Sequence, residues 1–390
     1  MKTGVKVPTV IALSSVLLPM VLLARGADAD SLTVVSNDDV VEIDGCVYVA
    51  KTFSRKPLTG ILRDFYANKQ IEREANFVNC RRDGPWVQWH ENGHKSLEQT
   101  WTDGRREGLY TEWHENGQKK QEVNYVNGRE DGLLTKWHAN GQEASEGNWV
   151  NGKLEGLRVT LYASGQKEIE ANWVSGKQHG PTLRWHENGQ KKSVETFVHG
   201  IVEGLSTGWH SNGQKSYEHT RANGKQHGLA RAWHENGQKK QEANYINGKP
   251  EGLVGDWYPN GQQESTSNFV NGRQEGLVTS WHENGQKKST SNFVNGGTVG
   301  LQLEWYANGQ PKVESNWVDG KQHGVTKAWH ENGQQESEAN FVDGKREGVA
   351  IEWYANGQKR VEANHRNGRM KRGAKWWDED GKTKKPEKRP

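Results

Sequence analysis

The pentapeptide Trp113-His114-Glu115-Asn116-Gly117 decides the fold, because it returns at a fixed interval along the chain. It recurs unchanged beginning at Trp89, Trp185, Trp233, Trp281 and Trp329, and close variants begin at Trp137, Trp209, Trp257, Trp305, Trp353 and Trp377. Phe65 and Leu161 take the same position in the two remaining units. The step is always 24 residues, which gives fourteen units without insertion or deletion. A fixed period of this length is typical of repeat architectures.

Three further positions of the repeat carry a recurring residue type at a constant distance from the anchor, and we call each such set of equivalent residues a column. A glycine lies five residues before each of the first thirteen, an Asn-Gly turn signal usually lies three and four residues after each, and an aromatic residue usually lies twelve residues after each. A second Asn-Gly or Asp-Gly turn follows that aromatic residue. The repeat anchors that these columns define include Trp89, Trp113, Trp137, Trp185, Trp209, Trp233, Trp257, Trp281, Trp305, Trp329, Trp353, Gly108, Gly132, Gly117, Gly237, Tyr125 and Tyr245.

This pattern predicts an all-β fold. Asn-Gly and Asp-Gly favour the positive φ angles of two-residue type I′ hairpin turns, and the stretches between them are rich in Val, Thr, Tyr, Phe and Trp. We therefore expect an extended antiparallel β-meander or solenoid of about fourteen 24-residue hairpin repeats, with about 28 strands. At about 4.8 Å between strands such a sheet is roughly 130 Å long.

The even period also predicts which side chains share a face. Every anchor Trp should lie on the same face of the sheet, about 10 Å from the next. A two-residue first turn places Trp113 opposite Lys120, and Tyr125 opposite Gly108 on the other face. The Tyr125 ring would then cover strand backbone left bare by the glycine, which would explain why both columns persist.

Composition agrees with a repeat array and excludes other classes. Only 32% of the 390 residues are hydrophobic, too few for a large globular core, yet 18 Trp, 10 Tyr and 7 Phe are not typical of a disordered chain. The 52 basic and 49 acidic residues nearly balance, which argues against a nucleic-acid surface.

The ends of the chain differ from the repeats. Residues 1–29 resemble a secretory signal peptide, with Lys2 and Lys6 before an apolar stretch and Ala27-Asp28-Ala29 as a cleavage signature. A membrane anchor is the competing interpretation, because about 17 apolar residues approach the lower limit for a span. We expect an N-terminal cap at 30–59, the repeat array at 60–381 and a basic, disordered tail at 382–390.

The only two cysteines, Cys46 and Cys80, lie near the start of the exported chain. In an oxidising compartment they can form one disulfide, and two buried free thiols are the alternative.

No constellation of catalytic or cofactor-binding residues stands out. His114, His234 and His282 belong to a histidine column that suggests metal binding, but its members recur about 10 Å apart and tyrosine replaces them in five units. Packing near the turn is therefore favoured, with partner contact as the functional alternative. Glu115 also belongs to a repeated column, in which Ala, Ser and Pro replace the acid, so it is not a catalytic pair. We expect no enzyme activity, no cofactor and no metal.

The alternation of glycine, aromatic residue and Asn-Gly resembles the MORN repeat, in the variant form found in bacterial proteins similar to YwqK-type antitoxins. Trp113-His114-Glu115-Asn116-Gly117-Gln118-Lys119-Lys120 and Asn244-Tyr245-Ile246-Asn247-Gly248-Lys249 carry the resemblance, which covers Gly60 to Gly381. It implies a non-catalytic β-repeat protein. Relatives of this kind are associated with toxin neutralisation, membrane lipids and protein scaffolding.

We therefore predict an exported scaffold, secreted or in the periplasm or cell envelope, that binds a protein partner through a long repeated surface. An envelope glycan- or lipid-binding array and a toxin-neutralising antitoxin or immunity protein are the alternatives. The sequence does not define the oligomeric state.

Overall fold

The computed structural model describes residues 33–36, 40–43, 46–49 and 58–384 of the chain, with side chains from residue 58 onward. The predicted signal peptide at 1–29 and residues 385–390 of the predicted tail lie outside the described residues. Strands make up the secondary structure of the described part, as the all-β prediction requires. No helix within these ranges is long and apolar enough to span a membrane.

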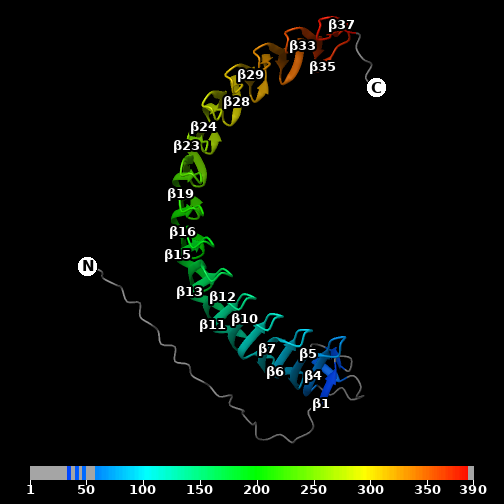
Figure 1. The fold of residues 1–390 in the computed structure, drawn as a ribbon, viewed down its shortest axis with the longest axis vertical. Coiled ribbons are helices and arrows are strands. Elements are labelled where there is room, and N and C mark those ends of the chain that lie inside the picture. Colours follow the sequence, from blue (N-terminus) through cyan, green and yellow to red (C-terminus); the bar gives the residue numbers. More distant parts are fainter. Residues whose placement is uncertain (1–32, 37–39, 44–45, 50–57, 385–390) are drawn as a thin grey trace, which may run out of the picture.

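The array is one long antiparallel sheet that is not closed and that bends into a crescent (Figure 1). Successive long strands of the array pair with one another, so the predicted meander is confirmed. At the N-terminal end β1 (Thr33–Ser36) pairs in parallel with β4 (Gly60–Phe65). β2 (Val40–Ile43) and β3 (Cys46–Val49) form a separate hairpin.

The remaining strands follow in sequence order. The first half of the array contains β5 (Ile71–Val78), β6 (Arg81–Trp89), β7 (Lys95–Thr102), β8 (Arg105–Arg106), β9 (Gly108–Trp113), β10 (Lys119–Val126), β11 (Arg129–Trp137), β12 (Glu143–Val150), β13 (Lys153–Leu161), β14 (Lys167–Val174), β15 (Lys177–Trp185), β16 (Lys191–Val198), β17 (Ile201–Val202), β18 (Gly204–Trp209), β19 (Lys215–Ala222) and β20 (Lys225–Gln226). The second half contains β21 (Gly228–Trp233), β22 (Lys239–Ile246), β23 (Lys249–Trp257), β24 (Gln263–Val270), β25 (Arg273–Gln274), β26 (Gly276–Trp281), β27 (Lys287–Val294), β28 (Gly297–Trp305), β29 (Pro311–Val318), β30 (Lys321–Gln322), β31 (Gly324–Trp329), β32 (Gln335–Val342), β33 (Lys345–Trp353), β34 (Lys359–Arg366), β35 (Arg369–Met370), β36 (Lys375–Trp377) and β37 (Thr383–Lys384).

The main sheet has 35 strands, more than the predicted 28. Six long strands are each split in two close to the repeated glycine, as where Glu107 separates β8 from β9. The two-strand hairpin unit itself is as predicted. At the far end β37 pairs with β36, so pairing continues into the segment assigned to the tail.

The second turn of each unit is the predicted two-residue hairpin. Val126 pairs with Arg129 across Asn127 and Gly128, whose φ angles are 53° and 81°. Two successive positive φ angles define a type I′ turn.

The first turn is not a two-residue loop, so this prediction was wrong. His114 and Gln118 close a three-residue loop, with the His114 amide donating to the Gln118 carbonyl at 2.9 Å. The Gly117 amide donates back to the His114 carbonyl at 2.9 Å, and Gly117 has φ 82°. This is the loop in which a glycine in the left-handed region completes a bulge. Trp113 consequently pairs with Lys119 and not with Lys120.

A bulge at Lys120 restores the predicted register on the rest of the strand. Glu112 pairs with Gln121, and Tyr125 pairs with Gly108 as expected. The reason given for the glycine was wrong, however. Gly108 has φ 79°, and a Cβ placed on it would meet nothing within 4 Å. The backbone conformation beside the strand irregularity therefore requires glycine, and covering by the Tyr125 ring does not.

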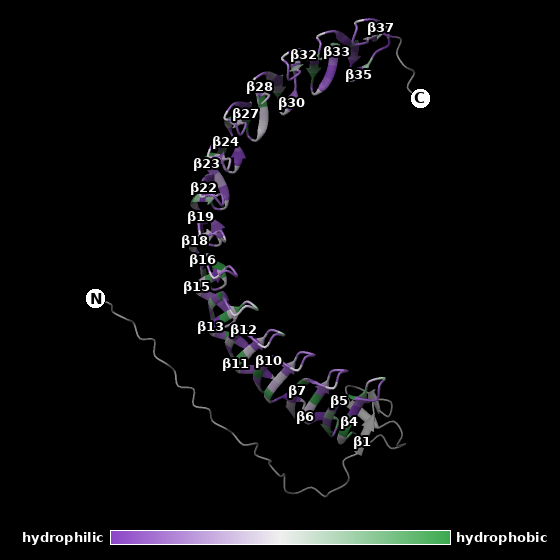
Figure 2. Cartoon of the chain, viewed as in Figure 1, coloured by the Kyte–Doolittle hydropathy of each residue, from purple (hydrophilic) through white to green (hydrophobic). Residues whose placement is uncertain are grey.

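The two faces of the sheet differ in exposure. One face carries a central row of directly paired residues, among them Val123 and Leu134, and we call it the row face. Two clusters of buried side chains lie on it, one including Leu62, Ala75 and Trp86 and the other Val123, Tyr125 and Leu134. We call the opposite side the open face, because exposed side chains such as Leu133 lie on it. Figure 2 shows hydrophobic segments recurring along the whole arc.

Candidate binding surface

The first-turn edge is held together by the histidine column. The His114 Nε2 lies 3.0 Å from the Trp137 carbonyl oxygen, one unit further along. Because a carbonyl can only accept, Nε2 carries the proton and donates. All eight histidines of the column make this bond at 2.7 to 3.0 Å, including His234 and His282. These rings therefore link neighbouring units, and their contact with a partner stays a prediction.

Tyrosine does the same work where it replaces histidine. The Tyr162 hydroxyl donates to the Trp185 carbonyl at 2.9 Å, and the four other tyrosines of the column make the equivalent bond. Burial raises the pKa of the Tyr162 phenol, and Glu168 and Glu187 act in the same direction.

The turn asparagines add a second link between units. The Asn140 side-chain amide donates to the Ala163 carbonyl at 2.9 Å, while its oxygen accepts from the Gln142 amide at 3.0 Å. The Asn140 side chain thus stabilises its own turn and also bonds to the first turn of the following unit.

At the second-turn edge an acid caps the following turn. The Glu107 carboxylate accepts from the Asn127 backbone amide at 2.8 Å. The same bond is made by Asp83, Asp131, Glu155, Glu203, Glu251, Glu275 and Glu347.

Lysines cover the rings of several anchor tryptophans. The Lys167 Nζ lies 5.7 Å from the Trp185 ring centroid and 2.8 Å from the Glu170 carboxylate. The same arrangement covers Trp113, Trp137, Trp233, Trp257 and Trp377. One face of each of these rings is therefore occupied by the protein itself.

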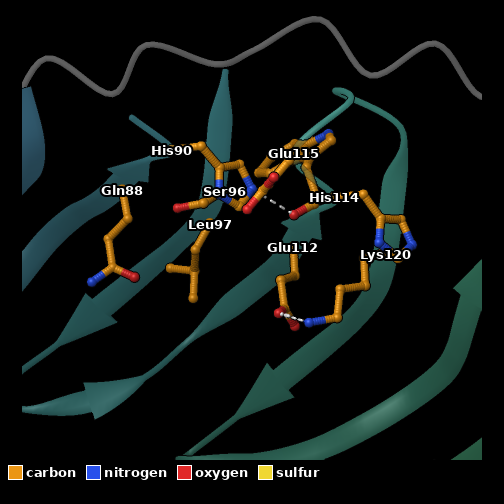
Figure 3. A pocket seen from close by; sticks show the side chains of 9 residues that line it. Gln88, His90, Ser96, Leu97, Glu112, His114, Glu115 and Lys120 are labelled. Atoms are coloured by element: carbon orange, nitrogen blue, oxygen red, sulfur yellow. Dashed lines mark hydrogen bonds and ion pairs between the residues drawn. The ribbon is translucent and has the colours of Figure 1, made fainter. Parts of the chain in front are cut away.

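A polar hollow of about 310 Å³ lies between two consecutive first turns (Figure 3). His90, His114 and Glu115 lie on one side, and the Glu112 carboxylate binds the Lys120 ammonium at 2.6 Å on the other. His90 Nε2 already donates to the Trp113 carbonyl at 3.0 Å. The Glu112 and Lys120 charges and the His90 Nε2 proton therefore already have partners within the repeat array.

Aromatic rings and an arginine pack together on the row face near the N-terminal end. The Arg106 guanidinium lies 5.2 to 5.6 Å from the rings of Trp101, Tyr110 and Tyr125. Burial raises the pKa of the Tyr110 phenol to about 12, and Glu112 acts in the same direction. This cluster stabilises the N-terminal units.

In the middle of the array the central row becomes polar. Arg221 replaces the aromatic residue of the repeat, and its Nε lies 3.3 Å from the His219 Nε2. Burial lowers the pKa of the His219 imidazole, and Arg221 adds to that effect. The hydroxyls of Thr182 and Ser206 are buried and find no hydrogen-bond partner among the described residues.

Cys80 is disulfide-bonded. The side chain of Cys46, the predicted partner, lies outside the described residues. Among residues with described side chains, no three His, Cys, Asp or Glu groups gather in a way that could hold a metal ion.

Sequence reasoning missed two rows of exposed hydrophobic side chains, which we call the aliphatic columns. Twenty of the twenty-three exposed large hydrophobic side chains in the described chain fall at two positions of the repeat, and they are 40 to 76% exposed. One column follows the repeated glycine and the other follows the second aromatic residue. The members are Leu109, Leu133, Leu157, Leu205, Leu229, Leu253, Leu277, Leu301, Val325, Val349, Val78, Val126, Val150, Val174, Val198, Ile246, Val270, Val294, Val318 and Val342.

The register places both columns on the open face. Leu133 pairs directly with Asn148, and Asn148 lies two residues before Val150. Directly paired residues and residues two apart in a strand share a face, so Leu133 and Val150 are diagonal neighbours on the same face. The 24-residue recurrence of Leu after Gly was the signal in the sequence that could have found them.

A row of exposed cations follows the second turn at the same edge, and we call it the cation row. Its members are Arg81, Arg105, Arg129, Lys153, Lys177, Lys225, Lys249, Arg273, Lys321, Lys345 and Arg369. Arg129 pairs with Val126 and Lys153 with Val150, which puts the row on the open face beside the aliphatic columns.

The comparisons with known proteins agree with this repeat. The family described as MORN repeat variant matches residues 58–79, 106–127, 178–199, 226–247, 274–295, 298–319, 322–343 and 346–367. The family described as MORN repeat matches residues 146–166 and 314–325. The chain is therefore a repeat protein that carries MORN repeat variants and MORN repeats along its length. The finer resemblance to YwqK-type antitoxins stays a prediction.

No curated protein matches the chain. The crystal structure of TcdB2-TccC3-Cdc42 is similar over 83% of this chain and 22% of that chain, at 10% identity and a TM-score of 0.15. The crystal structure of TcdB2-TccC3 without hypervariable C-terminal region is similar over 85% and 21%, at 9% identity and a TM-score of 0.15. This chain thus spans about a fifth of the length of those chains, and likenesses this weak carry no argument.

Proposed function

We propose that the protein is an exported, non-catalytic scaffold whose open face binds another protein. The observation that carries the proposal is the pair of aliphatic columns, which repeat along the sheet without cover from the described chain. Exposed apolar surface that is regular and extended is typical of interaction sites. A rigid array that offers the same contact many times can bind through many weak interactions.

The polar groups of the repeat support a structural role for its most regular residues. The histidines, tyrosines and turn asparagines are bonded to the next unit, and the acids near the second turn bind turn amides. The aliphatic columns take part in none of these bonds and remain exposed on the open face.

The glycan-binding alternative depends on tryptophan rings that can stack on sugars. In six units a lysine occupies one face of the anchor ring, as Lys167 does over Trp185. This cover favours the protein-binding proposal over a sugar-stacking array.

Affinity capture from cell-envelope extracts, with the full chain as bait, tests this function. We expect reproducible recovery of one or a few proteins by the wild-type chain. The matched bait carries Leu133→Asn, Leu157→Asn and Leu205→Asn, three exposed changes, and should recover much less. Failure to recover any protein, or recovery of glycan or lipid alone, would contradict the proposal.

A further inference from the structure

The cation row is unpaired over most of its length. Of its members only Arg81 makes an ion pair with another described residue, at 2.5 Å to Asp103. The nearest acids do not neutralise the others directly, because carboxylates such as that of Glu107 bind turn amides of the next unit. Uncompensated cations beside exposed aliphatic side chains indicate a partner that is both acidic and apolar.

The spacing of the row restricts the shape of that partner. Except where Ile201 and Gly297 interrupt the row, neighbouring cations lie two strands apart, or about 9.6 Å at about 4.8 Å per strand. A polyproline II segment advances about 3.1 Å per residue with three residues per turn, so every third side chain returns after about 9.3 Å. A polyproline II segment with an acidic residue at every third position therefore places its acids at nearly the same spacing as the cations of the row.

Other occupants fit the surface less well. A second copy of the chain would bring its own cation row against this one, and like charges repel. A membrane interface is typically contacted through exposed Trp and Tyr. The anchor tryptophans on this face are half-buried, and the exposed aliphatic columns contain only Leu, Val and Ile. Single-stranded nucleic acid needs exposed aromatic rings on which bases can stack. The anchor tryptophans share the open face, but they are half-buried, and in six units a lysine already lies over the ring.

We propose that the cation row and the aliphatic columns together bind an extended, polyproline II-like segment of a partner protein, with an acidic residue at every third position and aliphatic residues between. This inference rests on the proposed protein-binding function and names the partner's chemistry. Each acid meets one cation, and the aliphatic side chains contact Leu and Val of the open face.

The test uses the full chain and a fluorescein-labelled peptide with five Pro-Val-Glu repeats, with binding followed by fluorescence anisotropy. The comparison peptides are a permuted one with the same composition and irregular acid spacing, and one with Lys in place of Glu. We expect the regular acidic peptide to bind at least about tenfold more tightly than either, and to weaken as salt is raised.

The surface variant carries Arg129→Glu, Lys153→Glu and Lys177→Glu, three neighbouring members of the row. The matched control carries Lys192→Glu, Lys240→Glu and Lys288→Glu, which are also exposed but lie at the first-turn edge. We expect the surface variant to bind at least about tenfold more weakly than wild type and the control to stay within about twofold. Unchanged circular dichroism of both variants establishes that they remain folded.

Several results would overturn the inference. These are no binding of the regular peptide, equal binding of the permuted one, equal losses in both variants, or binding to phosphatidylglycerol vesicles without binding to the peptide. If proteins are still captured by the surface variant, the scaffold function stands and the assignment of this surface falls.

Discussion

His114 and Tyr162 perform one task with different atoms. The imidazole Nε2 and the phenol hydroxyl both reach the carbonyl of the next anchor, at 3.0 and 2.9 Å. A position that holds either His or Tyr requires a flat ring with a hydrogen-bond donor at its far end. The sequence showed the alternation, but only the structure shows which carbonyl accepts.

Replacing His114 tests this bond. His114→Phe keeps the ring and removes the donor, so we expect a local loss of about 1 kcal/mol, read from hydrogen exchange around β9 to β11. His114→Tyr is the matched control and should retain most of the protection. Equal losses in both variants would mean that ring shape, not the hydrogen bond, is what the column provides.

Gly108 is constrained by its backbone. Gly108→Ala places a side chain at φ 79° and should cost roughly 1 to 2 kcal/mol, although the space beside it is empty. Gly297→Ala is the control, because Gly297 has no positive φ and its Cβ would lie an ordinary 3.5 Å from the nearest atom. Thermal unfolding of both variants checks the difference. A harmless Gly108→Ala would show that the positive φ is not required.

Two buried serines on the row face should respond in opposite directions. The Ser206 hydroxyl has no hydrogen-bond partner among the described residues, whereas the Ser315 hydroxyl accepts from the Trp317 ring at 2.9 Å. Ser206→Ala should stabilise the protein by about 1 kcal/mol and Ser315→Ala should destabilise it by a similar amount. The denaturant midpoints of the two variants measure these stability changes. A loss of stability in Ser206→Ala as large as that in Ser315→Ala would contradict the conclusion that the Ser206 hydroxyl is unpaired.

At the scale of elements, the pairing of β9 with β10 places Tyr110 near Tyr125, with ring centroids 5.9 Å apart. Because burial raises the pKa of Tyr110 to about 12, its protonated form is favoured in the folded state. The contribution to stability is complete below about pH 10, the ordinary value, and is lost as the pH rises toward about 12.

Alkaline titration of unfolding midpoints checks this sign. Tyr110→Phe should flatten the fall in stability between about pH 10 and 12 relative to wild type. Tyr245→Phe is the control, because Tyr245 occupies the position of Tyr125 in a distant unit and not the position of Tyr110. The expectation fails if both variants follow the wild-type curve.

The two turns show what a sequence can and cannot predict about an element. Asn127-Gly128 forms the predicted two-residue turn, because both residues tolerate positive φ. Asn116-Gly117 is the same dipeptide but belongs to a three-residue loop. There the Asn116 side chain accepts from the Gln118 backbone amide and donates to the Ala139 carbonyl of the next unit. That second contact depends on the stacking of units, which local turn preferences do not contain.

At the scale of the whole molecule, the 24-residue period predicts the long open sheet because each unit repeats the same pairing. It does not predict which face stays exposed. Leu133 and Leu134 are adjacent and equally apolar, yet Leu133 is 53% exposed and Leu134 is 9% exposed. Only the register and the packing of neighbouring side chains distinguish them.

Small-angle X-ray scattering of the full chain tests the central claim most directly. A compact chain of 390 residues would have a radius of gyration of about 21 Å. The open crescent predicts a much larger value and a pair-distance distribution with a long tail. A radius near the compact value, with a symmetric distribution, would contradict the extended array and the long binding face that depends on it.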